Sequence, residues 1–242
     1  MKSETITISK DTIQRLLKDV KQIIKNPLTD NGIYYIHDED DILKGYALII
    51  GPSETPYFGG YYFFQLNYPA DYPHSPPNVK YCTNGDEIRF NPNLYKCGKV
   101  CISILNTWRG DQWTSCQTIS TVLLTLCTLL CENPLLNEPG VSKGNTDIDN
   151  YNKIIEYANL KIAVSYIASK KEGYYLPFFE SFYPFVKEHF LKNYEKLMEI
   201  AVKKKDTHEL IQTSLYSLSV SINYKKVIQY LTVAKEYIDA QK

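Results

Sequence analysis

The sequence has little of several features that mark common protein classes. Its 27 basic and 27 acidic residues give a formal net charge of zero, which predicts no nucleic-acid-binding surface. No stretch approaches the roughly 18 consecutive apolar residues of a membrane-spanning helix, and the N-terminal segment lacks the apolar core of a signal peptide. We therefore expect a soluble protein of the cytoplasm or nucleus that binds proteins or small molecules and no membrane.

Cysteine is also scarce. Six cysteines in 242 residues are too few for a disulfide scaffold, which fits a reducing compartment and predicts free thiols. Cys127 and Cys131 lie one helical turn apart, but they form no CxxC pair and have no histidine nearby in the sequence. We expect neither a zinc site nor any other metal.

The apolar content is sufficient for a packed core. Hydrophobic residues make up 44% of the chain and charged residues 22%, which argues against disorder. The length fits either one large domain or one domain of about 150 residues with an appendage. Neither an internal repeat nor a low-complexity tract is present.

A helix and then a sheet are expected in the N-terminal part of the chain. Residues 9–25 place their apolar side chains on one helical face behind a cap at Ser9. Four runs rich in β-branched and aromatic residues follow, and short links join the first three. These runs predict a four-stranded antiparallel meander and are residues 32–37, 43–51, 61–68 and 78–83.

The rest of the chain predicts mostly helix. A proline-rich link after the third run should be a rigid loop. The largely apolar residues 117–132 predict a central helix packed against the sheet, and residues 149–169 predict another. From residue 170 onward the pattern is helical throughout, with expected helices at 184–205, 207–220 and 223–240.

Residues 91–101, with the sequence NPNLYKCGKVC, are the most informative segment. They bring a potential nucleophile, Cys101, close in sequence to the side-chain amide of Asn93. The four histidines, which are His37, His74, His189 and His208, all lie well outside this segment. The usual cysteine–histidine pair therefore has no local candidate. A cysteine without a base suits a substrate that arrives already activated.

Several landmarks at consistent spacing resemble the ubiquitin-conjugating enzyme family. GPSETPYFGG, then YPADYPHSPPNV, then the tripeptide NPN, a cysteine eight residues beyond Asn93, and finally WTSC occur in the family's order. The resemblance covers residues 5–169 and implies an α+β fold: an N-terminal helix, a four-stranded antiparallel meander, an active-site loop, a central helix and further C-terminal helices. NPN in place of the commoner HPN, the CISIL run and the ENPLLNEPG segment resemble the larger Z-type members. We expect a catalytic core at 5–169 and a helical extension at 170–242.

This resemblance implies a transferase. Cys101 would accept ubiquitin or a ubiquitin-like modifier from an activating enzyme as a thioester and pass it to a substrate lysine or to a ligase cysteine. Thiol-for-thiol exchange is nearly isoenergetic and needs no dedicated histidine. The activating enzyme would use the ATP, so no cofactor is expected here. The alternative for Cys101 is an inert buried thiol.

The resemblance also assigns roles around the cysteine. Asn93 would place an amide near the thioester carbonyl, although it could equally brace the loop. Asn91 stands where most members carry a loop-ordering histidine. Asn137 and Glu138 are the nearest match to a gate loop that orients the incoming lysine, and a plain surface glutamate is the alternative.

Partner-binding positions are implied on three surfaces. His74 sits where many ligase partners expect a large apolar residue, and Trp113 and Ser115 belong to the WTSC segment. Lys10 and Arg15 lie on the helix face expected to dock the activating enzyme, with a solvated polar face as the alternative.

Two other function classes stay open from the sequence. One is a catalytically weak ubiquitin-binding scaffold that uses residues 170–242 to assemble a conjugation complex. The other is a cysteine protease, which needs a histidine within hydrogen-bond reach of Cys101.

Overall fold

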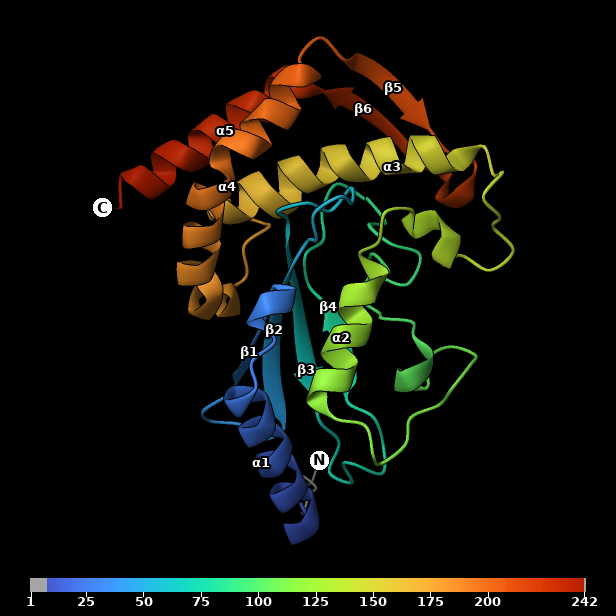
Figure 1. Cartoon of the computed structure of the whole chain (residues 1–242), viewed down its shortest axis with the longest axis vertical. Helices are drawn as coiled ribbons and strands as arrows, with labels where there is room; N and C mark the ends of the chain where they lie inside the picture. Colours follow the sequence, from blue (N-terminus) through green and yellow to red (C-terminus); the bar gives the residue numbers. More distant parts are fainter. Residues whose placement is uncertain (1–7, 242) are drawn as a thin grey trace, which may run out of the picture.

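The computed structural model of the protein describes residues 8–241 (Figure 1). Residues 1–7 lie outside the described residues. They include most of the N-terminal segment that lacks the apolar core of a signal peptide, and also residues 5–7 of the expected catalytic core. Within residues 8–241 no helix is both long and apolar enough to cross a lipid bilayer.

Helix α1 (Lys10–Lys25) begins where the sequence predicts. The hydroxyl of Ser9 accepts a hydrogen bond from the backbone N–H of Thr12 at 3.0 Å and caps the helix. The predicted apolar face is only partly buried, because α1 packs along the edge of the sheet against β1 and α2. Leu16 is fully buried, whereas Leu17 and Ile24 stay 42% and 69% exposed.

The predicted antiparallel meander is confirmed. The four-stranded sheet has the order β1-β2-β3-β4, so each strand pairs with its neighbours in the sequence. Ile33 lies opposite Ile49 and Phe64 lies opposite Tyr81 in the two outer pairings. The strands are β1 (Ile33–His37), β2 (Lys44–Ile50), β3 (Tyr61–Asn67) and β4 (Asn78–Tyr81).

Both faces of β3 are covered, which explains its unbroken aromatic run. Side chains alternate across a strand, so Tyr62 and Phe64 point to one face while Tyr61 and Phe63 point to the other. Tyr62 packs edge-on against Phe90 of the loop after β4. Phe63 stacks on Phe179 of the C-terminal segment, with ring centroids 3.7 Å apart. All four strand residues have zero exposure.

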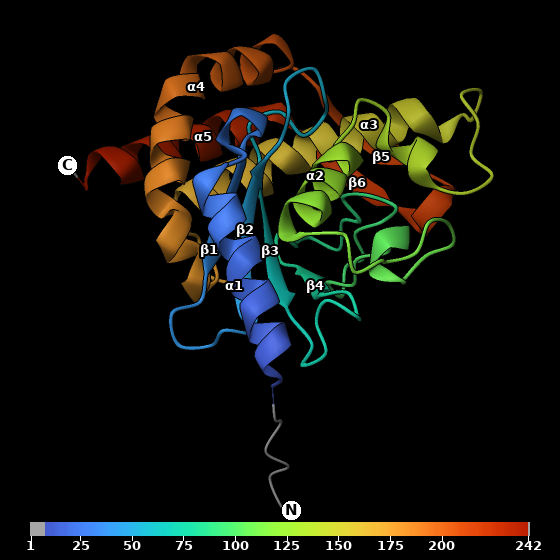
Figure 2. The ribbon, with the colours of Figure 1, turned by 60° about the horizontal axis from the view of Figure 1, so that its bottom comes forward.

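Two helices follow the loop after β4. Helix α2 (Ile119–Leu129) starts at a capping box formed by Thr118 and Thr121, and it is shorter than predicted at both ends. Helix α3 (Asp147–Ala158) runs on into a π-helical segment, Asn159–Tyr166. Figures 1 and 2 place α2 on one side of the sheet and α4 and α5 on the other.

Asn159 ties the end of α3 to the sheet and explains why glycine follows Gly59 in the turn before β3. Its side chain accepts a hydrogen bond from Tyr62 Oη at 2.7 Å and donates one to the carbonyl of Phe58 at 2.9 Å. A Cβ atom on Gly60 would lie only 1.9 Å from Asn159 Oδ1. Glycine is therefore required at position 60 for this close approach.

The C-terminal segment is not helical throughout. Helices α4 (Tyr183–Lys203) and α5 (Tyr224–Asp239) occur as predicted, but the helix expected at 207–220 is wrong. A β-hairpin of β5 (His208–Gln212) and β6 (Ser219–Asn223) replaces it. Apolar residues from Leu218 to Ile222 alternate with serine, which is the period of a strand, while the spacing from Ile211 to Leu218 fitted a helix equally well.

Residues 170–242 share a continuous hydrophobic core with the rest of the chain. Phe179 and Phe182 are fully buried against Phe63, and Tyr61 donates a hydrogen bond to the carbonyl of Val186 at 3.1 Å. The expected division at residue 169 therefore stays a prediction. Removing the extension would uncover one face of β3, so point substitutions are the cleaner way to examine its role.

Candidate active site

Asn91 anchors the loop that carries the expected nucleophile. Its side chain is fully buried and uses both ends of the amide. Nδ2 donates to the carbonyl of Leu129 at 2.7 Å and to Tyr57 Oη at 3.0 Å, while Oδ1 accepts from the backbone N–H of Asn93 at 2.9 Å. Asn91 therefore fastens the loop to the end of α2 and to the turn before β3, which is a loop-ordering role.

Asn93 and Cys101 lie side by side, as the resemblance implied. The backbone N–H of Cys101 donates to the carbonyl of Asn93 at 2.9 Å. In return Asn93 Nδ2 donates to the carbonyl of Cys101 at 2.6 Å. An amide nitrogen carries two N–H groups, so one remains for another acceptor. Asn93 Oδ1 is buried without a hydrogen-bond partner among the described residues.

The thiol of Cys101 is covered by a short loop. Cys101 is only 3% exposed, and its Sγ donates to the carbonyl of Thr107 at 3.4 Å. Thr107 is held there by its hydroxyl, which lies 2.9 Å from the carbonyl of Val100 and accepts from the N–H of Ile102 at 3.0 Å. A reagent can reach Sγ freely only when this loop moves aside.

Thr107 also lines two cavities. A cavity of about 650 Å³ lies between the proline-rich link and the active-site loop, and Lys80, Val100 and Thr107 are among its lining residues. A second cavity, of about 800 Å³, lies between residues 106–109 and Pro139. Thr107, whose carbonyl contacts the thiol, therefore borders two cavities that are each large enough for a peptide segment.

The gate loop faces the second cavity. Asn137 ends a short 3-10 helix, and its Nδ2 lies 3.5 Å from the carbonyl of Leu129, which is at the limit of a hydrogen bond. Glu138 precedes the cavity-lining Pro139, and its Oε2 accepts a hydrogen bond from Tyr216 Oη. The sequence pattern offered no signal for Tyr216, because it placed that residue in a helix far from the loop.

The family model described as "Ubiquitin-conjugating enzyme" matches residues 15–158, more than half of the chain. The chain belongs to the ubiquitin-conjugating enzyme family. Its α+β fold, with an N-terminal helix, a four-stranded antiparallel sheet and C-terminal helices, is the ubiquitin-conjugating fold.

Curated relatives extend the likeness to the Z-type members. A 159-residue segment is 43% identical to "Ubiquitin-conjugating enzyme E2 Z" of Danio rerio and covers 64% of this chain and 48% of that protein. The protein of the same name from Homo sapiens is 44% identical over 153 residues, with 62% and 43% covered. "Probable ubiquitin-conjugating enzyme protein 17" of Caenorhabditis elegans is 38% identical over 170 residues, with 64% and 23% covered. The chain thus spans about half or less of the length of these relatives.

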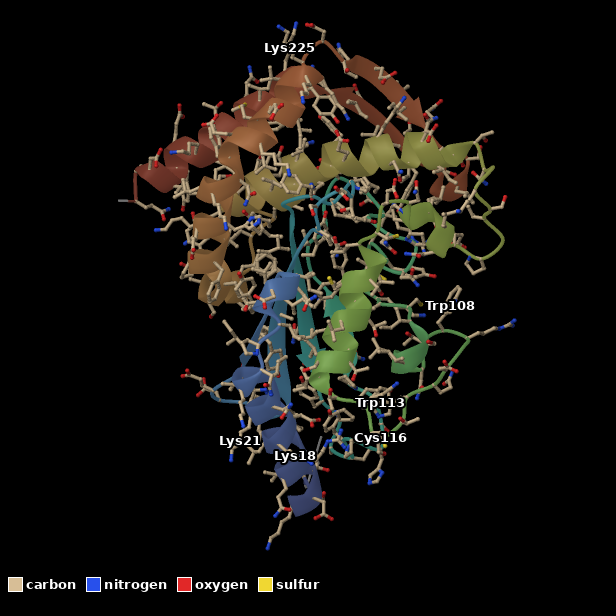
Figure 3. All side chains as sticks on the ribbon, in the orientation of Figure 1. Lys18, Lys21, Trp108, Trp113, Cys116 and Lys225 are labelled. Carbon is tan, nitrogen blue, oxygen red and sulfur yellow. The ribbon has the colours of Figure 1, made fainter. Side chains whose placement is uncertain are left out.

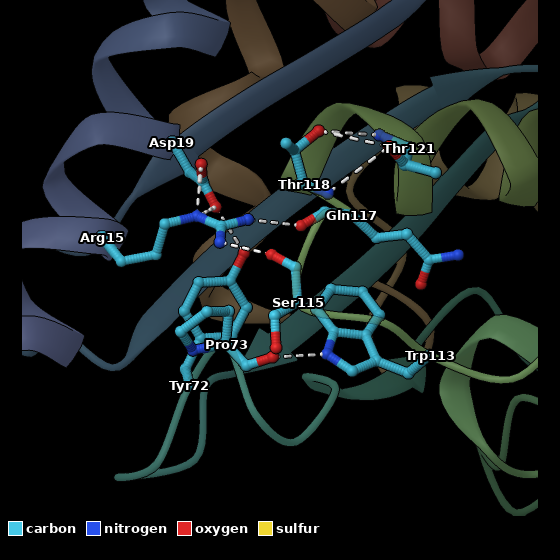
Figure 4. Close-up of polar contacts among 9 residues, drawn as sticks. All are labelled: Arg15, Asp19, Tyr72, Pro73, Trp113, Ser115, Gln117, Thr118 and Thr121. Carbon is cyan, nitrogen blue, oxygen red and sulfur yellow. Dashed lines mark hydrogen bonds and ion pairs between the residues drawn. The ribbon is translucent and has the colours of Figure 1, made fainter.

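Three of the five expected partner-binding residues of this ubiquitin-conjugating fold are exposed, and two of them lie in the loops expected to meet a ligase. His74 lies on the surface of the proline-rich link, and Ser115 is exposed in the loop before α2. Trp113 differs, because it is only 8% exposed. Its Nε1 donates to the carbonyl of Pro73 at 2.7 Å (Figure 4). Its backbone N–H donates to Asn106 Oδ1 at 2.9 Å. The indole joins two loops, and its binding to a partner stays a prediction.

Arg15 is engaged within the chain. Its guanidinium pairs with Asp19 at 3.0 Å and donates to the carbonyls of Ser115 and Gln117 at 2.5 and 2.6 Å (Figure 4). Asp19 is nearly buried and also accepts from Tyr72 Oη at 2.5 Å. Arg15 therefore fastens α1 to the loop before α2. Lys10, by contrast, is exposed at the start of α1.

Replacing Arg15 with alanine should lower the stability of the whole fold. The change removes the ion pair with the Asp19 carboxylate and the donor to two backbone carbonyls, and a loss of about 2 kcal/mol in the free energy of unfolding is expected. Urea denaturation measures it. Lys18, exposed on the same helix (Figure 3), is the control, and Lys18→Ala should stay within about 0.5 kcal/mol of the parent. Unchanged stability in Arg15→Ala would contradict the internal role.

Thr107→Val should make the thiol of Cys101 more accessible. The substitution keeps the size of the side chain but removes the hydroxyl that holds the loop over Sγ. Loss of about 1 kcal/mol raises the open population of the loop roughly fivefold, and the rate of alkylation should rise by the same factor. Iodoacetamide labelling followed by peptide mass spectrometry reports on Cys101 alone.

The control for this experiment is Thr114→Val. Thr114 is exposed in the following stretch of loop, and its side chain makes no hydrogen bond within residues 8–241. Equal alkylation of Cys101 in the Thr107→Val and Thr114→Val variants would show that Thr107 does not control access.

All six thiols are free, as predicted. Burial raises the pKa of Cys82 to about 11, and burial also raises the pKa of Cys127 and Cys131. These three thiols are poor nucleophiles at neutral pH, because little of each is thiolate.

No histidine serves Cys101 as a base. In residues 8–241, which include all four histidines, the thiol's hydrogen-bond partner is the carbonyl of Thr107. His37 contacts Tyr35 Oη and the carbonyl of Ile42, and His189 contacts Tyr61 Oη. The cysteine-protease alternative therefore lacks its second catalytic group. The same part of the chain contains no cluster of three His, Cys, Asp or Glu side chains suited to a metal ion.

Proposed function

We propose that this chain is a ubiquitin-conjugating transferase whose nucleophile is Cys101. Family membership supports the reaction class, and the reciprocal hydrogen bonds between Asn93 and Cys101 are the observation that carries the assignment of residues. The loop pinned by Asn91 holds both groups in one place. A rigidly placed thiol and amide are what acyl transfer requires.

In the charging step Cys101 takes the modifier from the activating enzyme. Its sulfur attacks the carbonyl carbon of the thioester formed by the modifier's C-terminal glycine. A new carbon–sulfur bond forms, the bond to the activating enzyme's sulfur breaks, and the proton of Cys101 passes to the departing thiolate. Because the bond broken and the bond formed are of the same kind, no strong base is needed.

In the discharge step a lysine amine attacks the thioester carbon. A carbon–nitrogen bond forms, the amine loses a proton, and Cys101 leaves as a thiol; a ligase cysteine can accept the modifier by a second exchange instead. Negative charge develops on the carbonyl oxygen, where the second N–H of Asn93 can donate. Glu138, on the loop that faces the neighbouring cavity, would orient the amine and help to remove its proton.

The partners follow from the same proposal. They are ubiquitin or a ubiquitin-like modifier, an activating enzyme that uses the ATP, ligases and protein substrates, in the cytoplasm or the nucleus. The exposed Lys10 on α1 would meet the activating enzyme, and the exposed His74 and Ser115 would meet a ligase. No cofactor of its own is needed for either exchange.

A charging assay tests the proposal. The chain is mixed with an activating enzyme, ubiquitin and Mg-ATP, and the products are separated with and without thiol reductant. We expect an ATP-dependent adduct of the mass of one ubiquitin that disappears with reductant. If a panel of activating enzymes and modifiers gives binding of the modifier but never such an adduct, the scaffold function replaces the transferase.

A further inference from the structure

The turn between β5 and β6 projects one tyrosine into the active-site region. Tyr216 and Ser217 both adopt left-handed backbone conformations, with φ of 62° and 50°. Such conformations are rare outside glycine and persist only where the surroundings hold them. Here Asp147 Oδ2, at the start of α3, accepts from the backbone N–H of Leu215 at 2.8 Å, and Asn150 Nδ2 donates to the carbonyl of Gln212 at 3.1 Å.

The ring of Tyr216 packs on the loop that carries the nucleophile. The guanidinium of Arg89 lies between two aromatic rings, 3.9 Å from the centroid of Tyr95 and 4.2 Å from that of Tyr216. Arg89 also donates a hydrogen bond to the carbonyl of Pro92, directly before Asn93. The C-terminal hairpin therefore contacts the catalytic loop through the stacked guanidinium of Arg89.

The hydroxyl of Tyr216 holds the gate loop. It donates to Oε2 of Glu138, and burial, together with this hydrogen bond, raises the pKa of Tyr216, so the hydroxyl stays a donor at neutral pH. Oε1 of Glu138 has no hydrogen-bond partner within residues 8–241. One oxygen of the carboxylate is thus restrained while the other stays available to a ligand.

We infer that Tyr216 is a positioning residue for lysine transfer, linking the Arg89–Tyr95 side of the active site to Glu138 in the gate loop. This inference rests on the proposed function. By restraining Oε2, Tyr216 holds Glu138 in a fixed position so that Oε1 can accept a hydrogen bond from the incoming lysine amine. A carboxylate held in place before the reaction needs no reorganisation during it. The C-terminal hairpin thereby becomes part of the transfer machinery.

The test separates charging from discharge in Tyr216→Phe, which keeps the ring on Arg89 and removes only the hydroxyl. The rate of thioester formation on Cys101 should stay within twofold of the rate of the parent chain. Single-turnover discharge to free lysine should fall about tenfold at saturating lysine, the size expected for one hydrogen bond to a charged group. Circular dichroism and thermal melting confirm that the variant is folded.

Tyr224→Phe is the matched control. Tyr224 also lies in the C-terminal segment, and its Oη donates to a glutamate, Glu156 Oε1, at 2.8 Å, but this pair is remote from the gate loop. Both variants lose one tyrosine–carboxylate hydrogen bond. Only Tyr216→Phe should slow discharge.

A double-mutant cycle with Glu138→Ala shows whether Tyr216 acts through Glu138. In the Glu138→Ala background, Tyr216→Phe should cause no further loss of discharge. A full additional tenfold loss in that background, or wild-type discharge in the single variant, would overturn the inference while leaving the proposed function intact. Failure of the parent chain to charge at all would overturn the proposed function and this inference with it.

Discussion

Cys101→Ala should abolish the modifier adduct, and Cys101→Ser should leave an adduct that survives reductant. Alanine has no nucleophilic atom, so no acyl bond can form at position 101. Serine can form an oxyester, which thiols do not cleave readily, so its adduct should accumulate slowly and persist. Denaturing electrophoresis with and without reductant distinguishes thioester, oxyester and no adduct in one experiment.

The chain offers a matched control four residues away. Cys97 lies in the same loop and is exposed, so it is a thiol that a non-specific acyl transfer could reach. Cys97→Ser should charge like the parent and remain sensitive to reductant. An adduct that persists in Cys101→Ala, or disappears in Cys97→Ser, would move the nucleophile away from Cys101.

Asn93→Ala should slow discharge to lysine by about 10²-fold while the chain still charges. The substitution removes the N–H that can stabilise negative charge on the thioester oxygen, and the loss of one such donor typically costs two to three orders of magnitude in rate. It also removes the hydrogen bond from Nδ2 to the carbonyl of Cys101. Pre-charged protein chased with free lysine gives the discharge rate directly.

Asn91→Ala separates transition-state stabilisation from simple loop bracing. Asn91 makes three hydrogen bonds that fasten the loop, and it is fully buried. Its loss should therefore lower the free energy of unfolding by a few kcal/mol and slow charging and discharge together. If Asn93→Ala reproduced that pattern, with charging impaired as strongly as discharge, Asn93 would only brace the loop.

Much of the fold could be predicted because its determinants are local. The cap at Ser9 lies next to the helix it starts, and each strand of the meander pairs with the next strand in the sequence. The seven residues between Asn93 and Cys101 likewise form a segment short enough for the loop to bring the two together. Short sequence patterns of this kind contain most of the information that specifies the helix start, the hairpins and the loop.

The hairpin of β5 and β6 could not be predicted from such local patterns. A segment with apolar residues at Ile211, Leu215 and Leu218 satisfies a helical period, and Leu218, Val220 and Ile222 satisfy a strand period. Burial decides between the two: Ile211 and Ile222 both lie in the core, where the hairpin packs against α3. Tertiary packing overrode a pattern that fitted both structures.

The roles of Trp113 and Arg15 show the same limit at the surface. Both residue types are common in binding surfaces, and the sequence placed them on faces that meet partners. In the folded chain the indole nitrogen reaches Pro73, 40 residues away, and the guanidinium reaches Ser115, 100 residues away. The hydrogen-bond donors of both side chains are therefore used within the chain, by backbone carbonyls of segments that are distant in sequence.

The sequence by itself determined the family, the meander and the pairing of a thiol with an amide in one short loop. Only the tertiary structure decided that Thr107 covers the thiol and that Tyr216 restrains Glu138 from 78 residues away. The reason is physical: hydrogen bonds and stacking between distant segments depend on how the whole core packs, and no local period encodes that packing.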